Sequence, residues 1–269
     1  MSWFRTNTTT EPTNLEDKFS IPYLRSLHQR LVENKVINAQ NQSMVIETLR
    51  VLSEMVVFGD NNYELLFEYI IFFHKIYLSC DNYYTFFNFN SLNKHSFFCE
   101  KNMLSLFLDI MHNAKEKSSV VFVPVLIQIL QTMSILCQCV KNDTSLYYIL
   151  SNNYINEFLK YPYDFENDEL LDHFVSFLKS LSLRMNDQTI QFFFIEKTKT
   201  IPLLNRAIEL LRFRDGMVRI AAQSSILNIF KVNVDQARSI CLQDETLHSL
   251  FSQIGKIKTY LFISKYNII

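Results

Sequence analysis

The side chains best suited to chemistry in this sequence are its cysteines and histidines, but their spacing builds no recognisable site. Cys137 and Cys139 stand two positions apart on an expected helix, where their thiols point in widely different directions and should not share a zinc ion. The six histidines are His28, His74, His95, His112, His173 and His248. None has the spacing to a carboxylate or thiol that a metal site uses, so we expect no metal ligands.

Two other groups could bind or react. Glu169 and His173 lie one helical turn apart and could meet, but a solvated pair on a helix surface is the favoured interpretation. Tyr147, Tyr148 and Tyr154 could stack on a ligand. Half-buried packing between helices explains them more simply, because tyrosine offers a large apolar ring with one polar end.

A local basic group, formed by Arg212, Arg214 and Arg219, could meet an acidic lipid or a protein partner, although a solvated ridge is the favoured interpretation. The chain also lacks the patterns GxxxxGK[ST], GxGxxG, HExxH and GxSxG, which place phosphate-binding, metal or nucleophilic groups. The sequence therefore predicts a protein that is not an enzyme, with no catalytic residue, no cofactor site and no assigned binding residue.

Composition favours helices. The 269 residues include only 3 glycines and 5 prolines, while 48% are hydrophobic. Sandwiches, barrels and doubly wound folds use more glycine in their turns and phosphate loops, so long helices with short polar connections fit better. The formal net charge of −1 gives no electrostatic case for binding nucleic acid.

Residues 215–232 carry the clearest repeat pattern, DGMVRIAAQSSILNIFKV. Asp215 can cap the helix N-terminus, and the apolar or small residues Val218, Ala221, Ala222, Ser225 and Ile229 then share one face. An Asp followed by Val-Arg and then by a small residue is close to the HEAT-repeat pattern, in which the arginine lies along the seam between repeats. The sequence predicts an all-α, armadillo/HEAT-like α-solenoid of stacked helices.

Helical periodicity continues in both directions. The expected helices cover residues 22–34, 43–58, 101–112, 120–140, 143–156, 168–181, 203–213 and 245–254. The second should end at Gly59, in the left-handed conformation common at helix C-termini. Residues 167 or 168 should cap the sixth.

Residues 120–140 contain no charge and are long enough to be a transmembrane candidate. Gln128, Gln131 and Gln138 project within one sector of a helical wheel, with Thr132 and Ser134 beside them. Lipid would leave these amides unsatisfied, so we interpret the sector as the polar edge of a central solenoid helix. An integral membrane protein, using this segment and also residues 65–78, is an alternative.

Several blocks resemble the FPL-domain family, in family order: MVIETLRVLSEMVVFGDNN (44–62), EKNMLSLFLDIM (100–111), DTSLYYILSNNYIN (143–156), DFENDELLDHFVSFLKSLSLRMN (164–186) and MVRIAAQSSILNIFKV (217–232). The Phe-Pro-Leu tripeptide that names the domain is replaced here by Ile201-Pro202-Leu203. Residues 19–254 are assigned to the domain and residues 1–18 to a flexible N-terminal tail. Residues 70–97 are expected to be an atypical insertion, either a loop or a translated intron, and residues 255–269 an atypical C-terminal tail. We therefore expect either a truncated gene model or a short paralogue.

This resemblance implies a non-enzymatic scaffold of endosomal membrane traffic and autophagy, acting in endosome maturation, lysosomal delivery and mitophagy. The implied partners are a Rab GTPase, whose activation it would support, a tethering complex or a ubiquitin ligase. An adaptor or regulatory component of a ubiquitin-ligase complex is the alternative function. With no signal peptide and an odd number of cysteines, we expect a cytoplasmic protein. The family resemblance implies that it associates peripherally with endosome, Golgi or autophagosome membranes.

Overall fold

The computed structural model describes residues 19–60, 103–113, 120–139, 141 and 143–266. In these ranges the chain is all-helical, and the only β pairing is an isolated bridge between Ile195 and Thr200. The predicted all-α class is confirmed. The predicted tail at residues 1–18 and the predicted insertion at residues 70–97 lie outside the described residues.

The α-helices are α2 (Ile21–Glu33), α3 (Gln42–Asp60), α5 (Met103–His112), α6 (Val123–Cys139), α7 (Asp143–Leu150), α8 (Tyr154–Lys160), α9 (Asp168–Ser182), α10 (Pro202–Leu210), α11 (Gly216–Phe230), α12 (Asp235–Cys241) and α13 (Asp244–Tyr266). Two short 3₁₀ helices, η1 (Ser151–Asn153) and η2 (Ile190–Phe193), lie between them.

Local capping sets several helix starts. The Ser20 hydroxyl accepts from the Tyr23 amide, and Pro22 occupies the first turn of α2, where its missing N–H costs nothing. The Asn167 side chain accepts from the Leu170 amide at the start of α9. At α11, Asp215 Oδ1 accepts from the amides of Met217 (2.6 Å) and Val218 (3.0 Å). The predicted caps of α9 and α11 are therefore confirmed.

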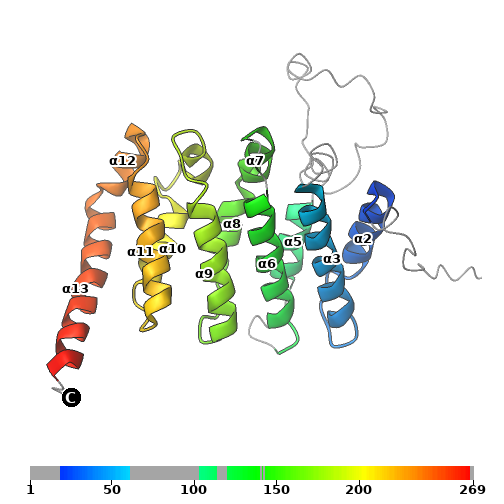
Figure 1. Cartoon of the computed structure of the whole chain (residues 1–269), viewed down its shortest axis with the longest axis horizontal. Coiled ribbons are helices and arrows are strands. Elements are labelled where there is room, and N and C mark those ends of the chain that lie inside the picture. The colour runs from blue at the N-terminus through cyan, green and yellow to red at the C-terminus, as the bar shows by residue number, and fades with distance from the viewer. Residues whose placement is uncertain (1–18, 61–102, 114–119, 140, 142, 267–269) are drawn as a thin grey trace, which may run out of the picture.

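The helices stand side by side in a row from α2 to α13 (Figure 1). Helices α3, α6, α9 and α11 form one layer, in which each helix contacts the next. We call this the front layer, because it faces the viewer in Figure 1. Helices α2, α5, α8 and α10 form the rear layer, again with contacts between successive members, and α10 also contacts α13. Each rear helix precedes its front helix in the chain.

A single hydrophobic core runs between the two layers. Its largest fully buried side chains are Phe107, Phe158, Phe174, Phe177 and Phe193. The rings of Phe158 (α8) and Phe177 (α9) meet edge to face, with centroids 6.4 Å apart, and so connect the layers. Burying a side chain of this size is worth about 1.5–3 kcal/mol, which makes this core the main source of stability.

Small polar side chains join neighbouring front helices. The hydroxyls of Ser53 (α3) and Thr132 (α6) are 2.8 Å apart and buried, and Thr132 also donates to the carbonyl of Gln128. Between α9 and α11, Ser225 donates to the Ser182 hydroxyl at 3.2 Å. These hydroxyls can lie inside the seams because each of them has a hydrogen-bond partner.

Three expectations about local structure are corrected. Helix α3 continues to Asp60, so Gly59 lies inside the helix, and no described glycine has a positive φ. Residues 143–156 do not form one helix, because η1 and a left-handed Asn153 (φ 64°) separate α7 from α8. Thr132 and Ser134 do not lie on an exposed edge of α6: both are buried, because the front layer covers them.

Helix α13 extends to Tyr266, beyond the last helical turns predicted from sequence, whereas the domain boundary at residue 254 stays a prediction. Within the described ranges, no helix combines the length and apolar character that crossing a membrane requires.

Candidate interaction surface

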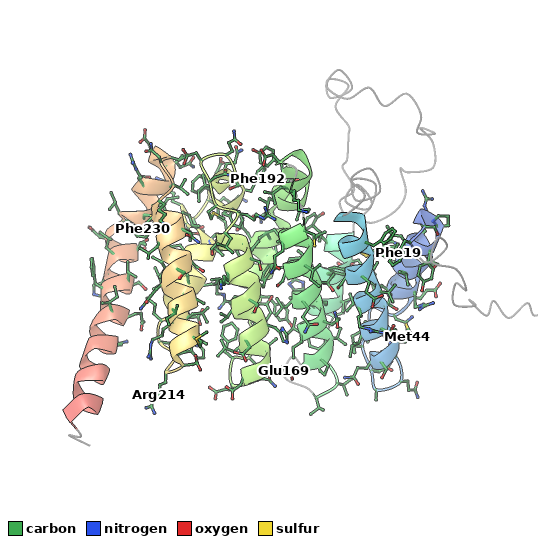
Figure 2. The ribbon with its side chains drawn as sticks, in the orientation of Figure 1. Phe19, Met44, Glu169, Phe192, Arg214 and Phe230 are labelled. Atoms are coloured by element: carbon green, nitrogen blue, oxygen red, sulfur yellow. The ribbon has the colours of Figure 1, made fainter. Side chains whose placement is uncertain are left out.

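The exposed side chains of the front layer form a broad surface, which we call the front face. On α3 it is charged, with Glu47, Arg50 and Glu54. On α6 it is made largely of amides, and on α9 it is charged again (Figure 2). Surfaces built from successive helices in this way suit the docking of extended or helical partners.

The front face is hollowed between α3 and α6 by an open groove of about 570 Å³. The groove is lined by Phe19, by Arg50, Ser53, Glu54 and Phe58 of α3, and by Gln128, Gln131 and Ile135 of α6. The rings of Phe19 and Phe58 stack with centroids 4.0 Å apart and make one apolar end. Beside this apolar end stands the guanidinium of Arg50, which pairs with Glu47 (2.7 Å) and Glu54 (3.7 Å).

Gln128 and Gln131 give the groove its polar wall, and Gln138 lies further along the same helix. Gln131 Nε2 lies 3.2 Å from His173 Nε2, and Gln138 Nε2 donates to the Ser180 hydroxyl at 2.7 Å, so both glutamines span the seam from α6 to α9. Gln128 is half-buried, and its side chain bonds to no residue that the structure describes. The predicted polar edge of α6 is confirmed for these three glutamines. An amide both donates and accepts, which suits recognition of a peptide backbone.

A second hollow of about 520 Å³ lies at the C-terminal ends of α9 and α11. Asp187 and Lys231 are among the residues that line it. Asp187 Oδ1 accepts from the Asn233 amide at 2.8 Å, so this carboxylate is already used to hold the segment between α11 and α12.

His173 lies in the seam between α6 and α9. Its Nε2 is 3.2 Å from Gln131 Nε2 on the neighbouring helix, and no ion pair joins it to Glu169 among the described residues. Helix periodicity alone does not reveal this contact, and the solvated pair with Glu169 stays a prediction.

Of the three tyrosines, Tyr147 and Tyr154 are half-buried, as expected for packing residues, and nothing is described of the Tyr148 side chain. The Tyr147 hydroxyl donates to Gln188 Oε1, and its ring lies 5.6 Å from that of Phe192. Burial, with a smaller contribution from Asp109, raises the pKa of Tyr154. The contacts of Tyr147 with Gln188 and Phe192 hold η2 against α7, and they support the packing interpretation.

The three arginines do not act as one basic group. Arg219 Nη1 donates to the carbonyls of Phe213 (3.1 Å) and Arg214 (2.7 Å), so it closes the turn before its own helix rather than lying along a seam between repeats. Arg212 lies 3.3 Å from Glu209 Oε1 and 5.2 Å above the centre of the Phe213 ring. Arg214 is exposed.

The cysteines and histidines that the structure describes do not gather at one site either. Cys137 is fully buried and Cys139 is half-buried, and burial raises the pKa of the Cys137 thiol to about 12. His112 bonds to the carbonyl of Leu108, whereas His248 is exposed on α13. No cluster of three His, Cys, Asp or Glu side chains that could hold a metal ion occurs among the residues that the structure places.

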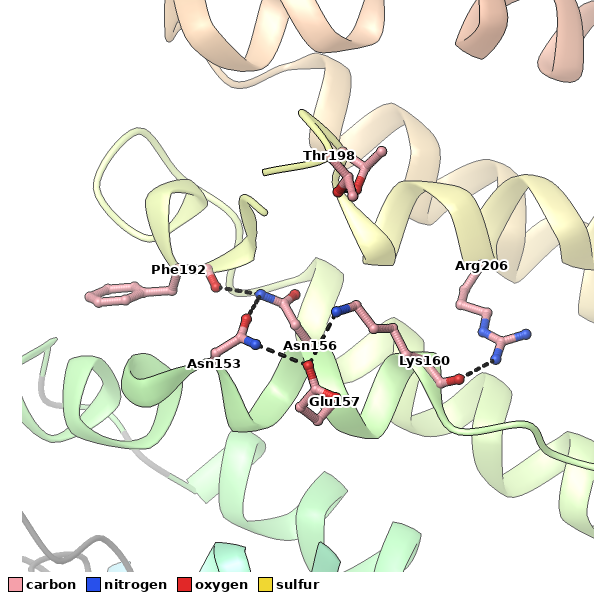
Figure 3. Close-up of polar contacts among 8 residues, drawn as sticks. Asn153, Asn156, Glu157, Lys160, Phe192, Thr198 and Arg206 are labelled. Atoms are coloured by element: carbon pink, nitrogen blue, oxygen red, sulfur yellow. Dashed lines mark hydrogen bonds and ion pairs between the residues drawn. The ribbon is translucent and has the colours of Figure 1, made fainter. Parts of the chain in front are cut away.

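Sequence reasoning missed a polar cluster around Asn156 (Figure 3). Asn156 Nδ2 donates to Asn153 Oδ1 (2.8 Å) and to the carbonyl of Phe192 (3.0 Å), and it is completely buried. Asn153 in turn donates to Glu157, which also pairs with Lys160. The paired asparagines in DTSLYYILSNNYIN were the available signal, because asparagine tolerates the left-handed conformation better than most residues.

The chain belongs to the FPL family. The sequence profile of this family, described as an uncharacterised conserved protein, matches residues 79–230. The resemblance to the FPL-domain family that was inferred from the sequence blocks is thus confirmed.

Individual relatives agree. The chain is 34% identical to Protein CLEC16A homolog of Drosophila melanogaster over 254 residues, which cover 94% of this chain and 20% of the relative. It is 34% identical to Protein CLEC16A of Homo sapiens, covering 87% of this chain and 19% of the relative. It is 30% identical to Protein TRANSPARENT TESTA 9 of Arabidopsis thaliana, covering 80% and 22%. The chain spans about a fifth of the length of these relatives. No solved structure matches it.

Proposed function

We propose that this chain is a non-enzymatic scaffold of endosomal membrane traffic and autophagy, supporting endosome maturation, lysosomal delivery and mitophagy. The observation that carries the proposal is its membership of the FPL family, together with its identity to CLEC16A proteins over most of its length. The role in traffic is the one that the family resemblance implies.

The architecture that we propose for this scaffold is an armadillo/HEAT-like α-solenoid. Support comes from the contacts between helices, which run from each helix pair to the next along the row rather than closing into a bundle. Support also comes from α9 and α11, because each buried residue of α11 has a buried counterpart at the corresponding position of α9: Val218, Ala222, Ser225, Ile226 and Ile229 match Leu170, Phe174, Phe177, Leu178 and Leu181. Such repetition generates the long surfaces that docking proteins use.

The partners that we propose are proteins of the endosomal and autophagic machinery: a Rab GTPase, a tethering complex or a ubiquitin ligase. The groove between α3 and α6 supports a docking role, because it combines an aromatic end, an arginine and the amides of Gln128 and Gln131. A short extended segment of a partner would place an apolar residue against Phe58 and its backbone against Gln128.

The test is deletion of the gene, followed by measurement of autophagic flux with and without inhibition of lysosomal degradation. The protein, tagged at its own locus, is imaged in the same cells. We expect lower flux in the deletion strain and tagged protein on endosomes or autophagosomes. Unchanged flux, with tagged protein dispersed throughout the cytosol, would contradict the proposal.

A further inference from the structure

Helix α11 presents an apolar face where the equivalent face of α9 is charged. Positions that correspond in the two helices carry Glu169, Asp172, Ser176 and Lys179 on α9, but Met217, Ile220, Ser224 and Leu227 on α11. The spacing follows helical turns in both cases, so each set forms one stripe. Both helices belong to the front layer, and their N-terminal ends lie at the same edge, near Glu169 and Arg214 (Figure 2).

The α11 stripe, formed by Met217, Ile220 and Leu227 with Phe230 at its C-terminal end, is open to solvent. The exposed fractions are 76% for Met217, 58% for Ile220, 60% for Leu227 and 38% for Phe230. Single exposed apolar residues are common on protein surfaces and need no explanation. Three apolar residues aligned on one helix face, with a fourth beside them at the C-terminal end, are informative, because exposing this area to water is unfavourable unless a partner covers it.

The two ends of the stripe carry positive charge. Arg214 stands before the helix and Lys231 after it, whereas Arg212 already pairs with Glu209 and the Arg219 guanidinium donates to two backbone carbonyls. The Asp215 carboxylate accepts from two backbone amides at the start of α11. The stripe is thus bordered by Arg214 at one end and Lys231 at the other, both exposed. A partner with acidic groups at the two ends of an apolar stripe would complement it.

A helix fits this surface better than a lipid bilayer does. Glu169 and Asp172 are exposed on the neighbouring helix α9, level with the N-terminal half of the stripe, and would repel an anionic membrane. A helical partner can instead lie along α11 and place its own charges to suit both neighbours. Helix α11 has 15 residues, so a partner helix of similar length, about 22 Å, would cover it.

We propose that the α11 stripe binds an amphipathic α-helix of a protein partner, with apolar residues at helical spacing and acidic residues near both ends. This inference rests on the scaffold function proposed above and names the chemistry of one partner. Binding by purified protein tests it directly, whereas flux in deletion strains tests the role in traffic, so the two can fail separately.

The probe is a display library of peptides about 16 residues long, selected on the purified full chain, with the retained peptides then synthesised and measured by fluorescence anisotropy. We expect retained peptides to carry apolar residues at three- and four-residue steps and more acidic than basic residues. Ile220→Glu and Leu227→Glu should each weaken binding roughly tenfold or more, because each places a charge in the centre of the contact.

Ser43→Glu, on an exposed position of α3, is the matched control and should leave binding unchanged. Circular dichroism melts establish that the variants are folded, and Ile220→Ser and Leu227→Ser replace any glutamate variant that is not. Failure to retain peptides, or retained peptides indifferent to both stripe substitutions, would overturn the proposal.

Two other occupants of the stripe would also overturn it. One is a bilayer, shown by binding to phosphatidylcholine–phosphatidylserine vesicles that Ile220→Glu abolishes. The other is a second copy of the chain, shown by a dimer in analytical ultracentrifugation that the same substitution dissociates.

Discussion

Arg206 of α10 donates a hydrogen bond of 2.6 Å from Nε to the carbonyl of Leu159, in the last turn of α8. The same guanidinium reaches the carbonyls of Lys160 (3.2 Å) and Tyr161 (2.7 Å). Arg184 makes a comparable contact one helix pair earlier, with the carbonyls of Cys137 and Gln138 at the end of α6. Each arginine satisfies carbonyls that a helix C-terminus leaves without partners, and so joins one helix pair to the next.

Arg206→Lys should lower the free energy of unfolding by about 1–3 kcal/mol, measured by urea titration. Lysine keeps the positive charge near Glu209, but its single ammonium cannot bond to three carbonyls at once. Arg212→Lys is the control, because Arg212 is exposed and pairs with the same Glu209, and it should change stability by less than about 0.5 kcal/mol. Equal effects of the two substitutions would show that the carbonyl contacts contribute nothing.

Asn156→Ala should destabilise the fold by about 1–3 kcal/mol, because the Phe192 carbonyl loses the hydrogen bond that it accepts from Asn156 Nδ2. Gln191→Ala, which removes an exposed amide near the same 3₁₀ helix, is the control. Thermal melts of the two variants make the comparison. A melting temperature for Asn156→Ala equal to that of the control would mean that α8 and η2 are not coupled through this amide.

Alkaline pH should weaken the fold. Burial raises the pKa of Cys137 to about 12, of Tyr161 to about 12 and of Cys241 to about 11. Folding raises these pKa values, so the groups contribute their full stabilisation at pH values below their pKa in the unfolded chain. This contribution to the free energy of unfolding is lost as the pH rises towards 11 to 12. Urea midpoints should therefore be flat from about pH 7 to 8 and then fall.

The Cys137→Ala variant should show a shallower fall in urea midpoint across this range, since it lacks a buried thiol whose pKa is raised on folding. Peptide mapping after iodoacetamide treatment at about pH 8 gives an independent readout, because only the thiolate reacts. Cys137 should be labelled only after the protein unfolds. Labelling at the same rate with and without urea would contradict the burial described here.

Much of the local structure could be predicted from the sequence, because it depends on neighbouring residues. Asp215 and Asn167 identify the starts of α11 and α9, since an N-cap needs only a side-chain acceptor before a helical pattern. Gly59 misled the prediction of a helix end. A glycine inside a helix costs only about 1 kcal/mol, which packing of α3 against α6 readily outweighs.

The contacts that join the layers could not be predicted in the same way. Thr132 lies in the same sector of a helical wheel as the glutamines of α6, yet it is buried, because α3 covers that side of α6. Arg206 and Arg184 resemble any surface arginines in sequence, and their carbonyl partners lie far away along the chain. The HEAT-like pattern instead pointed to Arg219. Its guanidinium donates to the carbonyls of Phe213 and Arg214, which lie in the turn before its own helix.

The most direct test of the scaffold proposal measures delivery of an endocytosed fluorescent cargo to lysosomes in a deletion strain that expresses wild-type protein, the Ile220→Glu variant or the Ser43→Glu variant. We predict that wild-type protein and Ser43→Glu restore the rate of delivery, whereas Ile220→Glu restores it poorly at equal protein level. Delivery that remains at the wild-type rate in the deletion strain itself would contradict a role in endosomal traffic.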